Sequence, residues 1–180
     1  MLISLIASLT INHVIGRHNC IPWSCKLDME WFKLHTLNKP VIMGRKTFES
    51  IGGKGLVGRL NIVLSNCARE VKNKYKYRDV IFVRTPQEAF LFLKSDIVVN
   101  SNEVMVIGGG KIYSIFMPYA SRLYLTYLNI EVSGDVFFPF FNLLEWKLIF
   151  LKFYYNYYLI DYILCFKIFE RFDININKLS

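Results

Sequence analysis

The sequence has few charged residues for its length and is correspondingly rich in apolar ones. Charged residues make up 20% of the 180 residues, and hydrophobic residues make up 53%. This composition excludes intrinsic disorder, because disordered chains are poor in apolar residues and rich in charge. The length suits one domain, or at most two small ones, with a substantial core.

Cysteines are also few, and no two of them form a C-x-x-C pair. At four cysteines in this length a disulfide framework is not expected, which favours reduced thiols in a cytosol. We expect no metal site either, because the nearest group of potential ligands has spacings that fit no zinc pattern: His13, His18, Cys20 and Cys25.

We expect neither a signal peptide nor a membrane span. Residues 1–16 lack a basic start and a small-residue cleavage site, and they are shorter than the roughly 20 residues that span a bilayer. The aromatic C-terminal stretch is interrupted by charged residues. We therefore expect a cytoplasmic protein that has no membrane partner.

The charge that is present is unevenly distributed. The net charge is 22 − 14 = +8 for the chain, 15 − 6 = +9 for residues 1–94 and 7 − 8 = −1 for residues 95–180. A charge of this size indicates an anionic partner. Nucleic acid, anionic lipid, a phosphorylated cofactor and a polycarboxylate all fit, and any such site should lie mainly in the first half.

Short apolar runs alternate with helical patterns along the chain. Strands are predicted at residues 2–9, 40–43, 60–64, 80–83, 104–107, 123–130, 148–155 and 163–169. Helices are predicted at residues 28–37, 45–51, 86–94 and 111–116, with Thr85 as the N-cap of the third. This alternation predicts an α/β domain with a mainly parallel sheet and an antiparallel edge. One domain is expected over residues 1–172, with a long loop at residues 11–25 and a polar tail at residues 173–180.

Two predicted strand-to-helix junctions contain glycine. Gly44 precedes Arg45, Lys46 and Thr47, and Gly108-Gly109-Gly110 precedes Lys111. Free N–H groups at a helix start suit a phosphate, although each junction alone could be a plain turn. Neither matches G-x-G-x-x-G or a P-loop. Together they favour a dinucleotide, because ligands of open α/β sheets lie at the carboxyl ends of the strands.

Three further residues are candidates for contacts with a second ligand. Asp28 opens an apolar helix, where it could stabilise the helix dipole or pair with an amidine-like nitrogen edge. Phe32, one turn later, could pack against a flat ring. Arg59 follows a glycine, and its guanidinium group could either be solvated or hold a carboxylate through two parallel hydrogen bonds.

Taken in order, these residues and their neighbours resemble dihydrofolate reductases of the bacterial chromosomal type. The matches extend over residues 2–171 and include Ile3-Ser4-Leu5-Ile6-Ala7, Val14-Ile15-Gly16, Pro22-Trp23, Asp28, Trp31-Phe32-Lys33, the run from Thr36 to Arg45, Gly58-Arg59, the run from Val104 to Gly110, Leu123-Tyr124-Leu125-Thr126, Gly134-Asp135 and Glu170-Arg171.

The resemblance implies an eight-stranded, mainly parallel sheet with an antiparallel C-terminal strand and about four flanking helices. It implies that NADPH delivers a hydride to C6 of 7,8-dihydrofolate and that N5 is protonated. The product, tetrahydrofolate, supplies one-carbon metabolism. It also implies a cytoplasmic monomer that antifolates inhibit, although the aromatic C-terminal region could drive association.

Roles for individual residues follow from the same resemblance. The catalytic set is Asp28, Thr126 and Tyr113, with Asp28 bonding the pterin and a water protonating N5. Substrate contacts are expected from Ile6, Ala7, Asp28, Phe32, Ile51, Arg59, Ile107 and Thr126. Cofactor contacts are expected from Ala7, Ile15, Gly16, Gly44, Arg45, Lys46, Thr47, Ser65, Asn66, Ile107, Gly108, Gly109, Gly110, Lys111, Ile112 and Tyr113.

Three further features of the site are implied. Arg45, Ser65 and Asn66 would bind the adenosine 2′-phosphate, which favours NADPH over NADH. Residues 12–25 would form a lid over the nicotinamide. The peptide between Gly109 and Gly110 would be cis.

Two other readings of the sequence remain open at this point. A reductase of riboflavin synthesis has the same fold, but that function would not explain why Asp28, Phe32 and Arg59 occur together. An RNA-binding module could use the six Lys and Arg residues of the segment 69–84, although such a segment is more simply a solvated surface.

Overall fold

The computed structural model describes residues 1–68, 75, 79–94, 101–155 and 162–172. Its centre is an eight-stranded sheet with the order β5-β4-β3-β6-β1-β7-β10-β9. The strands are β1 (Leu2–Thr10), β3 (Val41–Gly44), β4 (Asn61–Leu64), β5 (Val80–Val83), β6 (Glu103–Gly108), β7 (Arg122–Leu128), β9 (Trp146–Tyr154) and β10 (Leu164–Arg171). Strand β10 runs antiparallel to both of its neighbours, β7 and β9, and the other pairs of strands in this sheet are parallel. This arrangement confirms the predicted topology.

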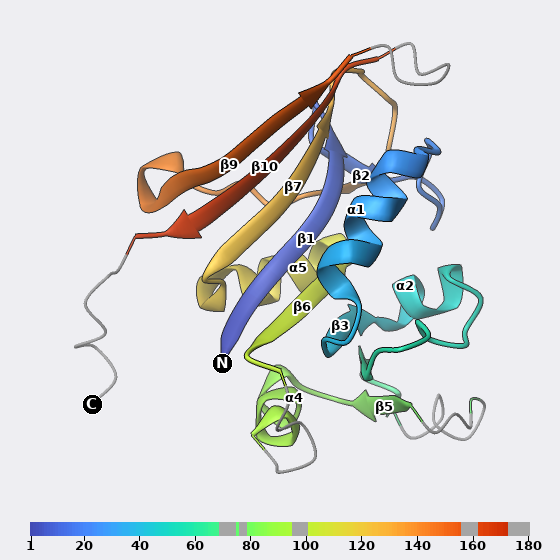
Figure 1. Cartoon of the computed structure of the whole chain (residues 1–180). Coiled ribbons are helices and arrows are strands. Elements are labelled where there is room, and N and C mark those ends of the chain that lie inside the picture. Colours follow the sequence, from blue (N-terminus) through green and yellow to red (C-terminus); the bar gives the residue numbers. More distant parts are fainter. Residues whose placement is uncertain (69–74, 76–78, 95–100, 156–161, 173–180) are drawn as a thin grey trace.

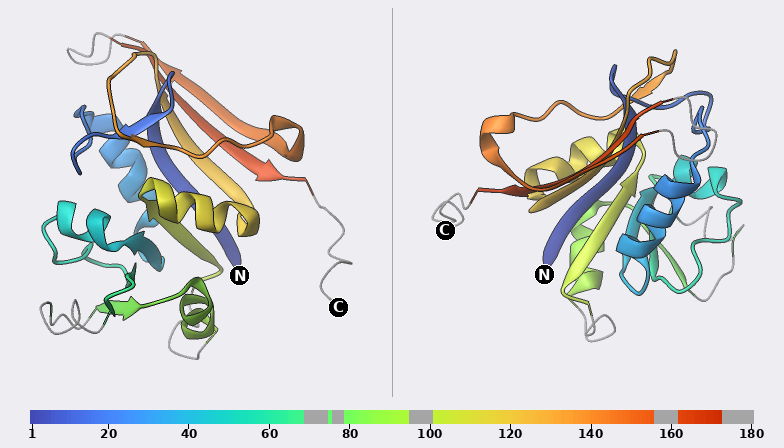
Figure 2. Two further views of the ribbon diagram at one scale, coloured as in Figure 1. Left: turned by 180° about the vertical axis from the view of Figure 1, so that it is seen from behind. Right: turned by 45° about the horizontal axis from the view of Figure 1, so that its top comes forward.

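Helices cover both faces of the sheet, so the domain has three layers (Figures 1 and 2). Helices α1 (Lys26–Thr36) and α2 (Arg45–Ser50) lie on one face, and α4 (Pro86–Leu93) and α5 (Gly110–Phe116) lie on the other. The N-cap predicted for α4 is confirmed, since Thr85 Oγ1 accepts a hydrogen bond from the Glu88 N–H. No helix among the described residues is long and apolar enough to cross a membrane.

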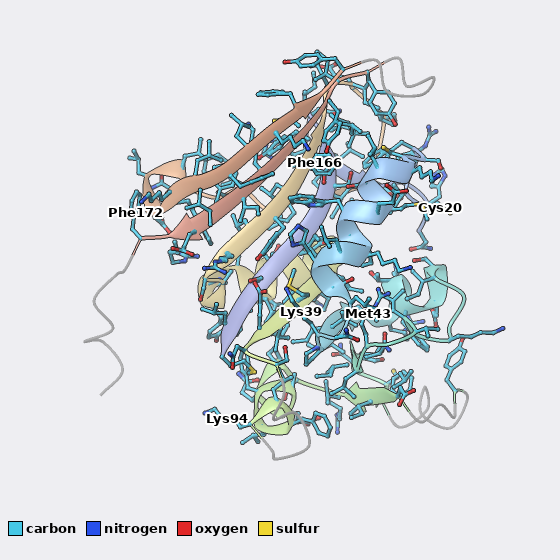
Figure 3. All side chains as sticks on the ribbon, in the orientation of Figure 1. Cys20, Lys39, Met43, Lys94, Phe166 and Phe172 are labelled. Carbon is cyan, nitrogen blue, oxygen red and sulfur yellow. The ribbon has the colours of Figure 1, made fainter. Side chains whose placement is uncertain are left out.

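The core is divided by the sheet, because successive side chains of a strand point to opposite faces. In β1, Leu5 and Leu9 are buried on the side of α4 and α5, together with Phe116. Ile6 is buried on the side of α1 and α2, together with Met43 and Phe48. A third cluster joins the start of α1 to β10 through Cys25 and Phe166. Figure 3 labels Met43 and Phe166, one residue from each of these two clusters.

The segment predicted as one long loop, residues 11–25, contains a short strand. Strand β2 (Val14–Gly16) pairs antiparallel with β8 (Val136–Phe137), which was not predicted. After β2 the chain reverses at His18 and Asn19, both with positive φ, between reciprocal hydrogen bonds of Arg17 and Cys20. Positive φ at both central residues is the type I′ geometry typical of two-residue hairpins.

Three sequence predictions lie at least partly outside the described residues, one of them the basic segment 69–84, of which residues 69–74 and 76–78 are not described. The polar tail at residues 173–180 is another. The third concerns the aromatic C-terminal region that could drive association, where only residues 154, 155, 162 and 163 of the stretch 154–163 are described. Within the described part, Tyr155 is exposed and Tyr154 is partly buried.

Candidate active site

A single carboxylate, that of Asp28, lies between α1 and the sheet. Thr126 of β7 and Ser8 of β1 are direct neighbours in the strand register, and their hydroxyl groups reach the Asp28 carboxylate. Burial raises the pKa of Asp28 above its ordinary value, and the hydrogen bonds from these two hydroxyl groups act in the opposite direction. The fold therefore brings together two of the predicted residues, Asp28 on α1 and Thr126 on β7, which are 126 − 28 = 98 positions apart in the sequence.

Ser8 was missed by the sequence prediction, as was the contact that Trp23 makes with it. The Trp23 Nε1–H donates a hydrogen bond of 3.3 Å to Ser8 Oγ. A signal for Ser8 existed in the sequence, because it follows Ile6 at the two-residue spacing that keeps side chains on one face of a strand.

Apolar residues surround this carboxylate on the same face of the sheet. Phe32 of α1 is partly buried and packs in the same cluster as Ile6 and Ile107, as expected for a pocket that takes a flat ring. Ala7 is buried toward the opposite face. Ile51, just after α2, is 38% exposed and is therefore not part of the core.

Tyr113 reaches the site from the other face of the sheet. Its hydroxyl group donates a hydrogen bond of 2.6 Å to the Ile6 carbonyl oxygen. Burial, together with the nearby negative charge of Asp28, raises the pKa of Tyr113 well above its ordinary value. The phenol is therefore neutral at physiological pH and serves as a hydrogen-bond donor.

The two glycine-containing junctions lie side by side at the carboxyl ends of β3 and β6. Met43 is paired with Gly108 in the strand register. A Cβ atom at Gly109 would lie 3.4 Å from Thr47 Oγ1, and one at Gly44 would lie 2.9 Å from Ile112 Cγ1. A side chain at Gly44 would therefore displace Ile112, and this close backbone arrangement suits an extended pyrophosphate.

The cis peptide bond was predicted one residue too late. It joins Gly108 to Gly109, not Gly109 to Gly110. Helix α5 begins at Gly110, one residue before the predicted start, and Gly109 is its N-cap. The Gly109 carbonyl oxygen accepts hydrogen bonds from the N–H groups of Ile112 and Tyr113.

Basic side chains surround these junctions, as predicted. Arg45 and Lys46 at the start of α2 and Lys111 in α5 are exposed. The register pairs Gly44 with Leu64, which brings Arg45 next to Ser65, the residue that follows β4. Ser65 is buried and its Oγ accepts a hydrogen bond from the Cys67 N–H, whereas Asn66 is exposed.

Arg59 lies just before β4 and contacts the end of α1. Its Nη1–H donates a hydrogen bond of 3.1 Å to Thr36 Oγ1 at the end of α1, and its Nε–H donates one of 3.2 Å to the Val57 carbonyl oxygen. Partial burial lowers the pKa of Arg59, which remains charged at neutral pH. These bonds hold the guanidinium group in a fixed orientation.

The predicted lid is attached to a second loop through Asp135. The His18 N–H donates hydrogen bonds of 3.2 and 3.1 Å to the two Asp135 carboxylate oxygens, and the Asp135 N–H donates one to the Gly16 carbonyl oxygen. Gly16 and Ile15 are thereby held in β2. Asp135 was not among the predicted site residues, because its partners are distant in the sequence.

Comparisons with known proteins agree with this geometry. The family model described as dihydrofolate reductase matches residues 2–171. A dihydrofolate reductase of Haemophilus influenzae is 42% identical over 148 residues, which cover 82% of this chain and 85% of that protein. One of Buchnera aphidicola from Schizaphis graminum is 41% identical over 172 residues, covering 95% of this chain and 100% of that protein.

The chain belongs to the dihydrofolate reductase family. A solved structure with a similar fold is that of the Enterococcus faecalis dihydrofolate reductase in complex with NADP(H) and RAB-propyl, with a TM-score of 0.83. It is 23% identical and the match covers 96% of this chain and 97% of that one. Members of the family are enzymes that reduce dihydrofolate with NADPH, and the comparisons support this activity for the chain over that of the riboflavin-pathway reductase.

Proposed function

We propose that this enzyme reduces 7,8-dihydrofolate to tetrahydrofolate with the pterin bound at Asp28 and the cofactor across the two glycine junctions. The observation that carries the proposal is the partly buried Asp28 carboxylate beside Thr126, enclosed by apolar side chains. A single carboxylate in such a pocket favours a ligand whose adjacent N–H groups match its two oxygens. The N3 and 2-amino groups of a pterin provide this pattern.

The roles of the other residues follow from their positions. Phe32, Ile6 and Ile51 would pack against the pterin and benzoyl rings, and Arg59 would hold the glutamate α-carboxylate of the substrate through its free N–H groups. Thr126 would help to orient the pterin through the Asp28 carboxylate. Because Asp28 lies near the amide edge of the pterin and not near N5, it raises the basicity of the bound ring and a water delivers the proton.

The residues at the glycine junctions fit NADPH. Gly44, Arg45, Lys46 and Thr47 would bind one side of the pyrophosphate, and the segment from Gly108 to Ile112 would bind the other. Ile107, Tyr113 and Ala7 would flank the nicotinamide, and Ile15 and Gly16 would cover it. When bound, NADPH supplies the hydride, and the residues of this chain orient it and exclude water.

We further propose that the enzyme is a cytoplasmic monomer and that antifolates inhibit it. All four cysteines are free, which suits a reducing compartment. Lys147 and Lys152 lie on the edge strand β9, where lysines discourage pairing with another sheet. An inhibitor with a cationic nitrogen edge would bind the same carboxylate, Asp28.

The experiment that tests this proposal is an absorbance assay of NADPH-dependent dihydrofolate reduction. The wild type should be active, and Asp28→Asn should reduce kcat/KM by at least about 100-fold, the lower range for a group that controls proton transfer. Glu30→Gln, two residues away but exposed, is the matched control and should keep wild-type activity. A fully active Asp28→Asn variant would contradict the proposed role of Asp28.

A further inference from the structure

We propose that Glu49 is a positioning residue for Arg45 and thereby contributes to the preference of the enzyme for NADPH over NADH. This inference rests on the proposed contact between Arg45 and the 2′-phosphate of the cofactor. Glu49 itself would not touch the cofactor. It would act by holding the Arg45 guanidinium group in the orientation that receives the phosphate.

The geometry of the pair leaves part of the guanidinium group available. Arg45 is the first residue of α2 and Glu49 lies one turn later on the same face. Arg45 Nη1 is 2.9 Å from each of the two Glu49 carboxylate oxygens. Among the residues that the structure describes, none accepts a hydrogen bond from Arg45 Nε or Nη2. These donors form the planar fork that matches two oxygens of a phosphate.

Fixing this side chain in advance should favour binding of the phosphate. An arginine side chain loses much rotamer freedom when it binds a ligand, and a partner that already restricts it lowers that cost. The Arg45 side chain is 42% exposed, so little else in its surroundings restricts it. NADH lacks the 2′-phosphate, and the pairing of Arg45 with Glu49 should therefore have no effect on NADH binding.

The negative charge of Glu49 has the opposite effect, because a carboxylate repels a nearby phosphate. Two substitutions separate orientation from charge. Glu49→Gln removes the charge but keeps an oxygen that accepts a hydrogen bond from Nη1. Glu49→Ala removes both. If orientation dominates, the glutamine variant should retain the cofactor preference that the alanine variant loses.

The test is to measure KM for NADPH and for NADH in both variants. We expect Glu49→Ala to raise the KM for NADPH about three- to five-fold, the range of a favourable exposed ion pair. Its KM for NADH and its kcat should stay within two-fold of wild type, and Glu49→Gln should resemble wild type. Glu30→Ala is the matched control, since Glu30 forms an i,i+4 pair with Lys26 on α1.

Two results would overturn the inference. Equal changes in both KM values, accompanied by a lower Tm, would assign Glu49 to the stability of α2 alone. A lower KM for NADPH in Glu49→Ala would show that Glu49 competes with the phosphate for Arg45.

Arg45→Ala distinguishes a failure of the role proposed for Glu49 from a failure of the proposed contact between Arg45 and the 2′-phosphate. If Arg45→Ala leaves the ratio of the two KM values unchanged, Arg45 does not bind the phosphate and both ideas are wrong. If Arg45→Ala abolishes the preference for NADPH while Glu49→Ala preserves it, only the role of Glu49 is wrong. We expect Arg45→Ala to abolish it and to remove the effect of a second substitution at Glu49.

Discussion

The Tyr113 hydroxyl group and the Ile6 carbonyl oxygen are 2.6 Å apart, and this hydrogen bond joins α5 to the central strand β1. The two residues are 107 positions apart in the sequence. Both are predicted to contact the ligands, Tyr113 at the nicotinamide and Ile6 at the pterin. The bond therefore couples a residue proposed to contact the nicotinamide to one proposed to contact the pterin.

Removing this hydroxyl group should affect both stability and turnover. Tyr113→Phe keeps the ring but deprives the buried Ile6 carbonyl oxygen of its donor, which typically costs about 1–3 kcal/mol. Urea unfolding should show this loss, and kcat should fall by several-fold. Tyr119→Phe, in an exposed position at the end of the same helical region, is the control. Unchanged stability in Tyr113→Phe would show that the bond contributes nothing.

Asp28 should reduce stability at neutral pH, because burial disfavours its charged form. Its folded-state pKa is raised above the ordinary value of 3.8, so its contribution is lost as the pH rises through the folded-state pKa. Asp28→Asn should therefore be more stable than wild type at pH 7, by roughly 1 kcal/mol. The gain should vanish below about pH 3, where Asp28 is protonated in both states.

Denaturant unfolding of wild type and Asp28→Asn across this pH range measures the effect. Glu30→Gln is again the control, and its stability at pH 7 should be within a few tenths of a kcal/mol of wild type, as for an exposed substitution. If Asp28→Asn is less stable than wild type at pH 7, the hydrogen bonds from Thr126 and Ser8 outweigh the cost of burial. Greater stability combined with lost activity is typical of a carboxylate retained for function.

The regular part of the fold could be predicted from local patterns alone. The apolar run of β1 and the amphipathic spacing of α4 predicted both elements to within one residue at each end. Such patterns report how each residue is buried along one element. They do not report which distant element it meets, and this is why β2 and β8 were missed: each is at most three residues long and pairs with the other across the sequence.

The same reasoning explains which parts of the candidate site could be predicted. Asp28 and Arg59 could be recognised as candidate site residues because each is a charged residue at the start of an apolar helix or strand pattern. Ser8 and Asp135 look ordinary in the sequence, and their importance comes from the register that sets Ser8 opposite Thr126 and from the loop that brings Asp135 to His18. Contacts of this kind depend on tertiary structure.

His35 should make the protein less stable in acid. Its ring packs against Trp31 and Tyr124, and its Nε2 is buried without a hydrogen-bond partner among the described residues. Burial lowers the pKa of His35, and the positive charge of Lys39 lowers it further, while Glu103 acts in the opposite direction. The folded state therefore disfavours the protonated ring, and stability is lost as the pH falls from the unfolded-state pKa of 6.5 through the lower folded-state value.

His35→Gln should show a smaller loss of stability between pH 7.5 and pH 5 than wild type does, by on the order of 1 kcal/mol. Thermal unfolding at the two pH values provides the measurement. His18→Gln changes an exposed histidine and should behave like wild type. An identical pH dependence in His35→Gln and wild type would mean that other groups cause the acid sensitivity.

Asp135 should control how well the predicted lid stays closed. Its carboxylate accepts two hydrogen bonds from the His18 N–H, and a side chain that lacks oxygens would leave that donor to solvent. Asp135→Ala should therefore favour open arrangements of residues 12–25. Since a closed lid orients the cofactor and excludes water, we expect hydride transfer to slow by about 10-fold.

Single-turnover kinetics with NADPH and its deuterated form measure that step directly. Glu131→Ala, on the same loop, should leave the step unchanged. If Asp135→Ala slows only product release, the contact controls ligand exchange and not the geometry of the reaction.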